Sequence, residues 1–310
     1  MTSLLILAAV LAAAPIERPL TAPGPQGPLA GTLLDAGKGA PVVLIIPGSG
    51  PTDRDGNNPL GVTAAPYRLL AEALGRRGIS SVRIDKRGMF GSKNAIPDAN
   101  KVTIADYAVD AHAWVKSIRE ETGAKCAWLL GHSEGALVVL SAAQQPKDIC
   151  GVISVSGMGR RLGTVMREQL RSNPANAPIL DAALSSIDTL EAGKPVDAAA
   201  LPAPLQPLFN PAVQPFLRDM MAQDPPRLAA SLKLPLLIVQ GDKDIQVAVQ
   251  DARALAAGQP KAKLAILPGV NHVLKVPAGD DPAANLATYA DPSLPIAPAV
   301  VDAIASFVKP

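Results

Sequence analysis

Gly131-His132-Ser133-Glu134-Gly135 is the stretch that decides the fold of this chain. It follows an apolar run at residues 127–130 and precedes another at 136–140, an order that predicts a strand, a tight turn and a helix. Neighbouring backbone passes so close in such a turn that a Cβ at either glycine would collide with it. The serine at the tip is strained and points away from the sheet, and the following helix offers free N–H groups to a developing negative charge. The stretch therefore predicts a nucleophile elbow.

The remaining sequence alternates short apolar runs with segments of helical periodicity, which predicts an α/β fold with a mostly parallel sheet. Besides the strand that enters the elbow, strands are expected at 27–35 (antiparallel), 42–46, 79–84, 149–156, 236–240 and 263–267. Flanking helices are expected at 66–77, 103–121, from the elbow to about 144, and 297–308. Thr103 and Asp106 are placed as a variant of the capping box at the start of the second of these helices.

Residues 158–232 differ from the rest of the chain, because they are rich in proline and charge and show helical fragments without a buried strand pattern. We expect a helical cap here, inserted into a core that is built from residues 15–157 and 233–310. Hydrophobic side chains of a cap either line a substrate pocket or pack between cap and core. The candidates are Leu208, Phe209, Phe216, Met220 and Met221.

Composition excludes several classes of partner. A net charge of +2 creates no strong field for nucleic acid or an acidic partner, and no basic run is interleaved with aromatic residues. Aromatic residues make up only 3% of the chain, so the expected pocket is lined by aliphatic side chains and methionine. No metal or other cofactor is expected, because the chain lacks a glycine-rich phosphate loop of the right form and its histidines and cysteines lack metal-ligand spacing. These features do not determine the oligomeric state.

The apolar run at residues 4–14 has the length of the hydrophobic region of a signal peptide and is too short to span a membrane. Residues 12–14 offer a small-residue cleavage site, so residues 1–14 are interpreted as a signal peptide of a periplasmic or secreted protein. No lysine or arginine precedes the run, and Pro15 directly follows the expected cut. The alternative is an uncleaved core segment in a cytoplasmic protein.

Two cysteines are placed where they could form a disulfide. Cys126 opens the strand that leads into the elbow, and Cys150 opens the next strand along the chain. If these strands are parallel neighbours, their first residues lie about 4.8 Å apart, a separation that a disulfide accepts. In an oxidising compartment the two could pair, whereas the alternative is a pair of buried free thiols.

A serine nucleophile needs a base within hydrogen-bond reach and an acid that orients the base. Of the three histidines, His132 adjoins the serine and projects elsewhere, and His112 lies in the middle of a helix. His272 follows the last expected strand, on the sheet edge where open α/β sheets gather their sites, and is the predicted base. The loop after the preceding strand offers Asp242 and Asp244. We favour Asp244 as the acid and regard Asp242 as a turn residue that bonds its own backbone.

A tetrahedral intermediate also needs donors for its oxyanion. One predicted donor is the backbone N–H of Glu134, and the second is the N–H of Ser49, with Gly50 next to it. The second donor belongs to a long loop that begins at Gly48 and contains three consecutive charged residues. These residues either form a buried ion network that fixes the loop near the site or are solvated loop charges; they are Asp53, Arg54 and Asp55.

With these motifs the chain resembles the α/β-hydrolase superfamily over nearly all of its length after residue 14. Within the superfamily it looks like a bacterial branch of esterases and serine-aminopeptidase-like hydrolases. The motifs that carry this resemblance are G-S-G-P-x-D-R-D, D-K-R-G-x-x-x-S and two late loops, at residues 48–55, 85–92, 240–247 and 268–275. The resemblance implies an eight-stranded sheet with a helical cap, and a triad of Ser133, Asp244 and His272.

Two positions depart from the wider superfamily. Pro47 stands where many members have histidine before the oxyanion glycine, which alters how the loop is braced but leaves the backbone donor in place. Glu134 is unusual in being charged. Its side chain either lies near the site or is tied to Arg87 or Lys86, and Arg87 is counted with the residues that support the site.

The expected activity is metal-free hydrolysis of small-molecule carboxylic esters with short to medium acyl groups, through an acyl-enzyme on Ser133. An aminopeptidase is the nearest alternative and would need an acidic cap residue to hold a free amine. The candidates are Glu168, Asp181, Asp188 and Glu191. A thioesterase or acyltransferase would use the same triad, and a non-catalytic binding protein on the same scaffold is a further alternative.

Overall fold

A computed structural model describes residues 15–309 of the chain. The predicted signal peptide, residues 1–14, lies outside the described residues. None of the helices within residues 15–309 is both long enough and apolar enough to cross a membrane.

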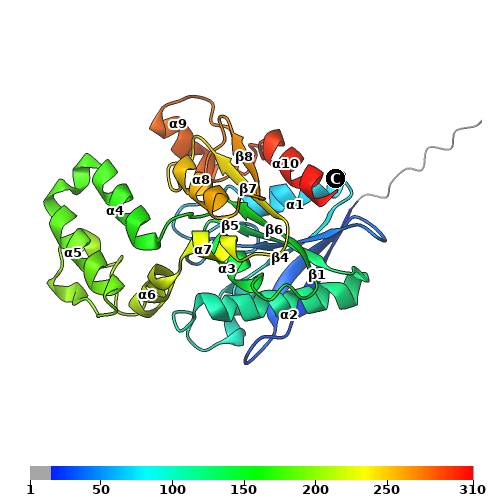
Figure 1. Ribbon diagram of the computed structural model, residues 1–310, viewed down its shortest axis with the longest axis horizontal. Helices are drawn as coiled ribbons and strands as arrows, with labels where there is room; N and C mark the ends of the chain where they lie inside the picture. Colours follow the sequence, from blue (N-terminus) through cyan, green and yellow to red (C-terminus); the bar gives the residue numbers. More distant parts are fainter. Residues whose placement is uncertain (1–14, 310) are drawn as a thin grey trace, which may run out of the picture.

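Within the described residues, eight strands form one sheet in the order β1-β2-β4-β3-β5-β6-β7-β8 (Figure 1). β1 pairs antiparallel with β2, β2 pairs antiparallel with β4, and the pairs from β4 to β8 are all parallel. The carboxyl ends of these six parallel strands therefore meet at one edge of the sheet. The strands are β1 (Ile16–Ala22), β2 (Leu29–Asp35), β3 (Val42–Ile46), β4 (Ser80–Ile84), β5 (Ala127–His132), β6 (Ile149–Val155), β7 (Leu236–Gly241) and β8 (Lys263–Leu267).

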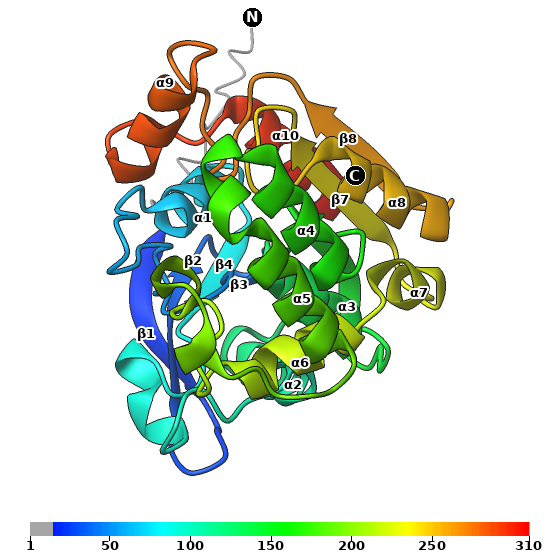
Figure 2. The same ribbon diagram turned by 90° about the vertical axis from the view of Figure 1, so that its left-hand side faces the viewer.

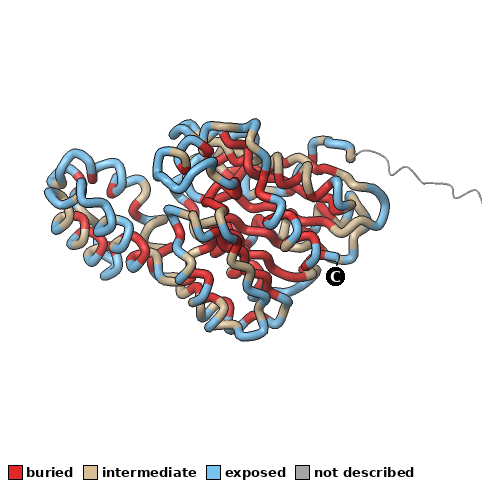
Figure 3. Tube along the Cα trace, turned by 90° about the horizontal axis from the view of Figure 1, so that it is seen from above, coloured by how far each residue is buried: buried red, intermediate tan, exposed pale blue. Residues whose placement is uncertain are grey.

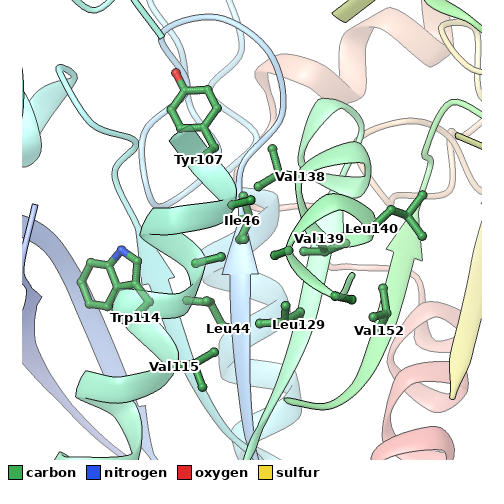
Figure 4. Packing of buried hydrophobic residues seen from close by; sticks show 14 of the residues in the cluster. Leu44, Ile46, Tyr107, Trp114, Val115, Leu129, Val138, Val139, Leu140 and Val152 are labelled. Atoms are coloured by element: carbon green, nitrogen blue, oxygen red, sulfur yellow. The ribbon is translucent and has the colours of Figure 1, made fainter. Parts of the chain in front are cut away.

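Helices cover both faces of the sheet, so its central strands are apolar on both sides. Val42, Leu44 and Ile46 of β3 pack into one core cluster, and Val43 and Ile45 pack into the other. The first cluster includes α2 (Ile104–Thr122), α3 (Glu134–Ala142) and α8 (Val249–Gly258), and the second includes α1 (Pro66–Arg76) and α10 (Pro298–Val308). Figure 3 shows the buried residues concentrated in the sheet, and Figure 4 shows the first cluster around β3 and α2.

Local signals explain several element ends. The Thr103 side chain accepts a hydrogen bond from the Asp106 N–H while the Asp106 side chain accepts one from the Thr103 N–H, so the predicted capping box is confirmed. α2 ends at Gly123, which adopts the left-handed conformation of a helix C-cap. Among the strands and α-helices outside residues 158–232, three were not predicted from the sequence: β1, α8 and α9 (Pro282–Ala287). β1 alternates exposed and buried residues at the sheet edge, and α9 is only six residues long.

Residues 158–232, the expected cap, contain helices and no strand; we refer to them as the helical insertion. It comprises α4 (Leu162–Ser172), α5 (Leu180–Glu191), α6 (Gln214–Ala222) and α7 (Pro225–Ala230), besides short 3-10 turns. α4, α5 and α6 project from one side of the sheet in Figure 1 and lie in front of it in Figure 2. They share a small hydrophobic cluster that includes Met166, Ile187 and Phe209. α7 instead packs on the core, against α3 and α8.

A disulfide joins Cys126 to Cys150, so of the two states open to these cysteines the structure has the paired one. Their Cα atoms lie 5.3 Å apart, at the starts of the neighbouring parallel strands β5 and β6. The segment between them, at a sequence separation of 24, carries the elbow and α3. The bridge therefore closes a loop that contains the predicted nucleophile.

Candidate active site

The predicted elbow lies between β5 and α3. Ser133 has φ 55° and ψ −119°, a backbone conformation that a non-glycine residue rarely adopts and that indicates local strain. A Cβ on Gly131 would lie 2.0 Å from the Gly135 carbonyl oxygen, and a Cβ on Gly135 would lie 2.4 Å from the Ile46 oxygen. The predicted reason for the two glycines is thus confirmed. The Ser133 N–H donates to the Val155 carbonyl at 2.9 Å, which ties the elbow to β6.

Asp244 and His272 lie together on the loops that follow β7 and β8. His272 Nδ1 lies 2.8 Å from Asp244 Oδ2, and both side chains are buried. Asp244 Oδ1 also accepts the backbone N–H groups of Gln246 and Val247. Burial alone would raise the pKa of Asp244, but His272 and these hydrogen bonds outweigh it and lower the pKa, so the carboxylate stays ionised. Asp242 accepts from the Gly269 N–H at 2.7 Å, a neighbouring turn rather than its own backbone, and is not the partner of His272.

Ser133 and His272 line one small cavity of about 110 Å³. Its wall also includes Gly48 and Ser49 from the loop after β3, and Tyr289 from the chain after α9. The structure thus brings the predicted nucleophile, Ser133, and His272, which Asp244 orients, to the same small cavity.

Of the two predicted oxyanion donors, Ser49 lines this small cavity, and Glu134, which directly follows Ser133, lines the adjoining larger cavity. Gly48 passes so close to the elbow that a Cβ on it would lie 3.2 Å from the Ser133 Cβ. Neither the Ser49 N–H nor the Glu134 N–H donates to an acceptor within residues 15–309. Both N–H groups are therefore unpaired among the described residues, and an oxyanion requires such free donors. Gly50, the neighbour of Ser49, is exposed and lines the adjoining large cavity.

Tyr67 and His132 link the oxyanion loop to the base, and sequence reasoning missed this link. The Tyr67 hydroxyl accepts from the Gly48 N–H at 3.0 Å, so its own hydrogen is free to be donated to His132 Nδ1 at 2.9 Å. His132 Nε2 then carries the hydrogen and donates to the His272 carbonyl at 2.8 Å. Burial lowers the pKa of His132 to about 3, so the ring is neutral. The sequence held one signal that could have drawn attention to Tyr67, because the chain has only three tyrosines.

Of the three charged loop residues, Arg54 and Asp55 form ion pairs that hold the loop, and their partners lie on or directly after β4. Arg54 donates to Asp85 at the end of β4, with 3.1 Å from Arg54 Nε to Asp85 Oδ2. Asp55 lies 3.2 Å from Arg83, which is on β4. Asp53 instead holds its own loop, because Asp53 Oδ1 accepts two backbone N–H groups at 2.9 Å. The loop is therefore fixed by ion pairs to β4 rather than by pairs within itself.

The side chain of Glu134 pairs with Lys86. Lys86 Nζ lies 2.8 Å from Glu134 Oε1 and donates to the Gly48 carbonyl at 2.7 Å, and both charged side chains are 2% exposed. Arg87, the other candidate, lies 2.6 Å from Asp110 of α2 and also contacts Asp106. Arg87 therefore anchors the turn after β4 to α2, and Lys86 joins the elbow to the oxyanion loop.

A second, larger cavity of about 470 Å³ lies between the core and the helical insertion. It adjoins the small cavity, since Ser49 lines both. Most of its wall is aliphatic, as the composition predicted. Of the five candidate lining residues, Leu208, Phe216 and Met220 line it, whereas Phe209 and Met221 belong to the hydrophobic cluster of the insertion.

The acidic residues proposed to hold a free amine lie elsewhere. Glu168 pairs with Arg160, and both Asp188 and Glu191 pair with Arg167. Asp181 is exposed, and none of the four is among the described residues that line the large cavity. Over residues 15–309 no three histidine, cysteine or acidic side chains gather into a group that could hold a metal ion.

Comparison with known proteins assigns the chain to a family. The Alpha/beta hydrolase family matches it over residues 42–288, most of its length. This chain belongs to the alpha/beta hydrolase family. A curated relative, Esterase EstD of Thermotoga maritima, is 27% identical over 244 residues, which cover 76% of this chain and 54% of that protein. The alpha/beta hydrolase described here thus spans about half the length of that relative.

Solved structures of other esterases share its fold. An esterase from Thermogutta terrifontis with malate bound has a TM-score of 0.56 at 17% identity, covering 96% of this chain and 98% of that one. Est1E from Butyrivibrio proteoclasticus with ferulic acid bound has a TM-score of 0.55 at 19% identity, covering 87% and 95%. An esterase from Pyrococcus furiosus has a TM-score of 0.54 at 18% identity, covering 83% of each chain. The predicted α/β-hydrolase fold is confirmed.

Proposed function

We propose that this alpha/beta hydrolase cleaves carboxylic esters of small molecules through an acyl-enzyme on Ser133. One observation carries the proposal: a histidine oriented by a buried carboxylate at 2.8 Å opens into the same small cavity as the strained elbow serine. This combination supplies the nucleophile, the base and the orienting acid that acyl transfer needs. The esterase names of the curated relative and of the similar structures agree with it.

In this mechanism Ser133 Oγ attacks the ester carbonyl carbon while His272 Nε2 takes the hydroxyl proton. The carbonyl oxygen becomes negative and is held by the N–H groups of Ser49 and Glu134. When the tetrahedral intermediate collapses, the carbon–oxygen bond to the alcohol breaks and His272 returns its proton to that alcohol. Water then attacks the acyl-enzyme by the same path and releases the carboxylic acid. Asp244 stays ionised throughout and stabilises the imidazolium.

The two cavities support a proposal for where the two halves of the ester bind. Because His272 must protonate the leaving alcohol, the alcohol lies on the side of His272, which lines the small cavity. The acyl group then extends to the other side, past Ser49 and Glu134, which line the large cavity. A mostly aliphatic space of about 470 Å³ suits a short to medium acyl chain. Among the described residues, no acidic residue of the insertion lines the large cavity. This disfavours the aminopeptidase alternative.

Export is proposed as well. The disulfide between Cys126 and Cys150 supports it, because disulfides persist in the periplasm and outside the cell and are rare in reducing cytosol. The signal-like residues 1–14 agree with this compartment.

The test is hydrolysis of p-nitrophenyl esters from acetate to decanoate by the wild-type protein and by Ser133→Ala, with Leu-p-nitroanilide and a thioester in parallel. We expect ester turnover that falls by about 10⁴-fold or more in Ser133→Ala. Turnover of the anilide alone would replace the proposal by an aminopeptidase, and a strong preference for the thioester would replace it by a thioesterase. Folded wild-type protein that is silent on every substrate would refute hydrolysis and favour a binding protein.

A further inference from the structure

The large cavity has a polar corner formed by Glu134, Lys86 and Tyr107, and two polar atoms of this corner lack a partner in the described part of the chain. The rest of the wall is mostly aliphatic, and its further polar side chains include Asn100, Gln169 and Asn176. Glu134 lines this cavity and is 2% exposed. Its Oε1 accepts from Lys86, but Oε2 has no hydrogen-bond donor within residues 15–309. A carboxylate oxygen that is largely withdrawn from water is stabilised by a donor that reaches it through the cavity.

Tyr107 brings a second such atom to the same corner. It lines the cavity, is 4% exposed, and its hydroxyl has no hydrogen-bond partner in the described part of the chain. Figure 4 shows this hydroxyl directed away from the labelled aliphatic side chains of the core cluster. Burial, and next the charge of Glu134, raise the pKa of Tyr107, so the hydroxyl keeps its proton and can donate it.

Lys86 connects these two side chains. Its Nζ lies 2.8 Å from Glu134 Oε1 and 5.2 Å from the centroid of the Tyr107 ring. The Lys86 charge therefore compensates the charge of Glu134, and the corner offers one free acceptor and one free hydroxyl rather than a free negative charge. This distinguishes it from the amine-binding acid that an aminopeptidase would need.

A hydroxyl group satisfies both free atoms at once. It can accept from the Tyr107 hydroxyl and donate to Glu134 Oε2. An ammonium group has no lone pair for Tyr107 and would meet the charge of Lys86, a keto oxygen has no hydrogen for Glu134, and a carboxylate would be repelled by Glu134. We propose that this corner binds a hydroxyl on the acyl chain of the substrate, so that the enzyme prefers hydroxyacyl esters to unsubstituted ones. This inference rests on the proposed ester hydrolysis.

The corner also indicates where the hydroxyl lies along the chain. Glu134 directly follows Ser133, and consecutive Cα atoms are about 3.8 Å apart, so the corner is next to the reacting carbonyl. The hydroxyl therefore belongs near the carbonyl, and the remaining carbons enter the aliphatic part of the wall. A hydroxyl at the far end of the chain would lie away from Glu134 and Tyr107 and could not pair with both.

The experiment compares kcat/KM for methyl hexanoate, both enantiomers of methyl 3-hydroxyhexanoate, and methyl 6-hydroxyhexanoate, measured by pH-stat with the wild-type protein. We expect one 3-hydroxy enantiomer to be preferred to methyl hexanoate by about tenfold, and the 6-hydroxy ester to be less preferred than this enantiomer. In Tyr107→Phe the ratio of 3-hydroxy to unsubstituted kcat/KM falls about fivefold, because one of the two hydrogen bonds is lost.

Tyr289→Phe is the matched control, since it removes the same atom from a tyrosine that lines the small cavity and not the large one. The ratio stays at the wild-type value in this control. If methyl hexanoate is hydrolysed and neither 3-hydroxy enantiomer is preferred, the hydroxyl inference is overturned and ester hydrolysis stands. Equal losses of the ratio in both tyrosine variants would overturn it too. If no ester is hydrolysed in a Ser133-dependent way, both proposals fall. The wild-type comparison decides the question even if Tyr107→Phe does not fold.

Discussion

Replacing Tyr67 by phenylalanine removes one oxygen atom and leaves two buried polar groups without their partner. The first is the Gly48 N–H, 3.0 Å from the hydroxyl, and the second is His132 Nδ1, 2.9 Å from it. Tyr67 is 2% exposed and His132 is 5% exposed, so water has little access to either orphaned group. The phenylalanine ring would otherwise fill the same space.

Each unsatisfied buried group costs about 1–3 kcal/mol, so Tyr67→Phe should lower the free energy of unfolding by about 2–6 kcal/mol. This is a large share of the typical total of about 5–15 kcal/mol. Catalysis should suffer separately, because Gly48 precedes the predicted oxyanion donor Ser49. Loss of a whole donor costs about 10²–10³-fold in kcat. Lys86 still holds the Gly48 carbonyl, so we expect a smaller loss of about 10- to 100-fold.

The assay is urea unfolding and ester turnover for the wild type, Tyr67→Phe and Tyr289→Phe. Tyr289 is the control for stability because its hydroxyl accepts one hydrogen bond from the exposed Gln246 side chain, so its loss should cost under about 1 kcal/mol. The reasoning is refuted if Tyr67→Phe is no less stable than Tyr289→Phe. Unchanged kcat in a destabilised Tyr67→Phe would show that the link stabilises the fold without positioning the oxyanion loop.

Three further predictions follow from the same structure. Replacing Cys126 and Cys150 by alanine should lower the free energy of unfolding by about 3.5 kcal/mol, because the bridge closes a 24-residue separation; a urea midpoint insensitive to this double change would contradict it. Asp244→Asn should lower kcat by about 10⁴-fold, whereas Asp242→Asn should change it only a few-fold, and equal losses would remove the distinction between them. The pKa of His132 is about 3 in the folded protein against 6.5 ordinarily, so below pH 6.5 the unfolded chain binds more protons than the folded one. Stability should therefore fall as the pH drops from 6.5 toward 3, by up to about 1.4 kcal/mol per pH unit, and urea unfolding at pH 7, 6, 5 and 4 that gives a constant free energy would exclude this contribution.

Short-range signals in the sequence were enough to predict the fold and the main candidate residues. The elbow can be predicted from the sequence because Gly131 and Gly135 meet a purely local requirement, the close passage of backbone around Ser133. His272 and Asp244 are readable because each follows an apolar strand, and the carboxyl ends of parallel strands share one edge. An edge strand is recognised by alternating buried and exposed residues. This alternation is weak in β1, which is why β1 was missed.

The sequence by itself thus determined most of the strands and helices of the core, the elbow, and the chain positions of the nucleophile, acid and base candidates, because periodicity and turn chemistry act over a few residues. Only the tertiary structure decided that Glu134 pairs with Lys86 rather than Arg87, and that Tyr67 and His132 connect the loops of Gly48 and His272. Partners in these contacts are separated by 19 to 140 residues. Which side chains meet across such distances depends on helix rotation and on the packing of whole layers, and no local pattern encodes those.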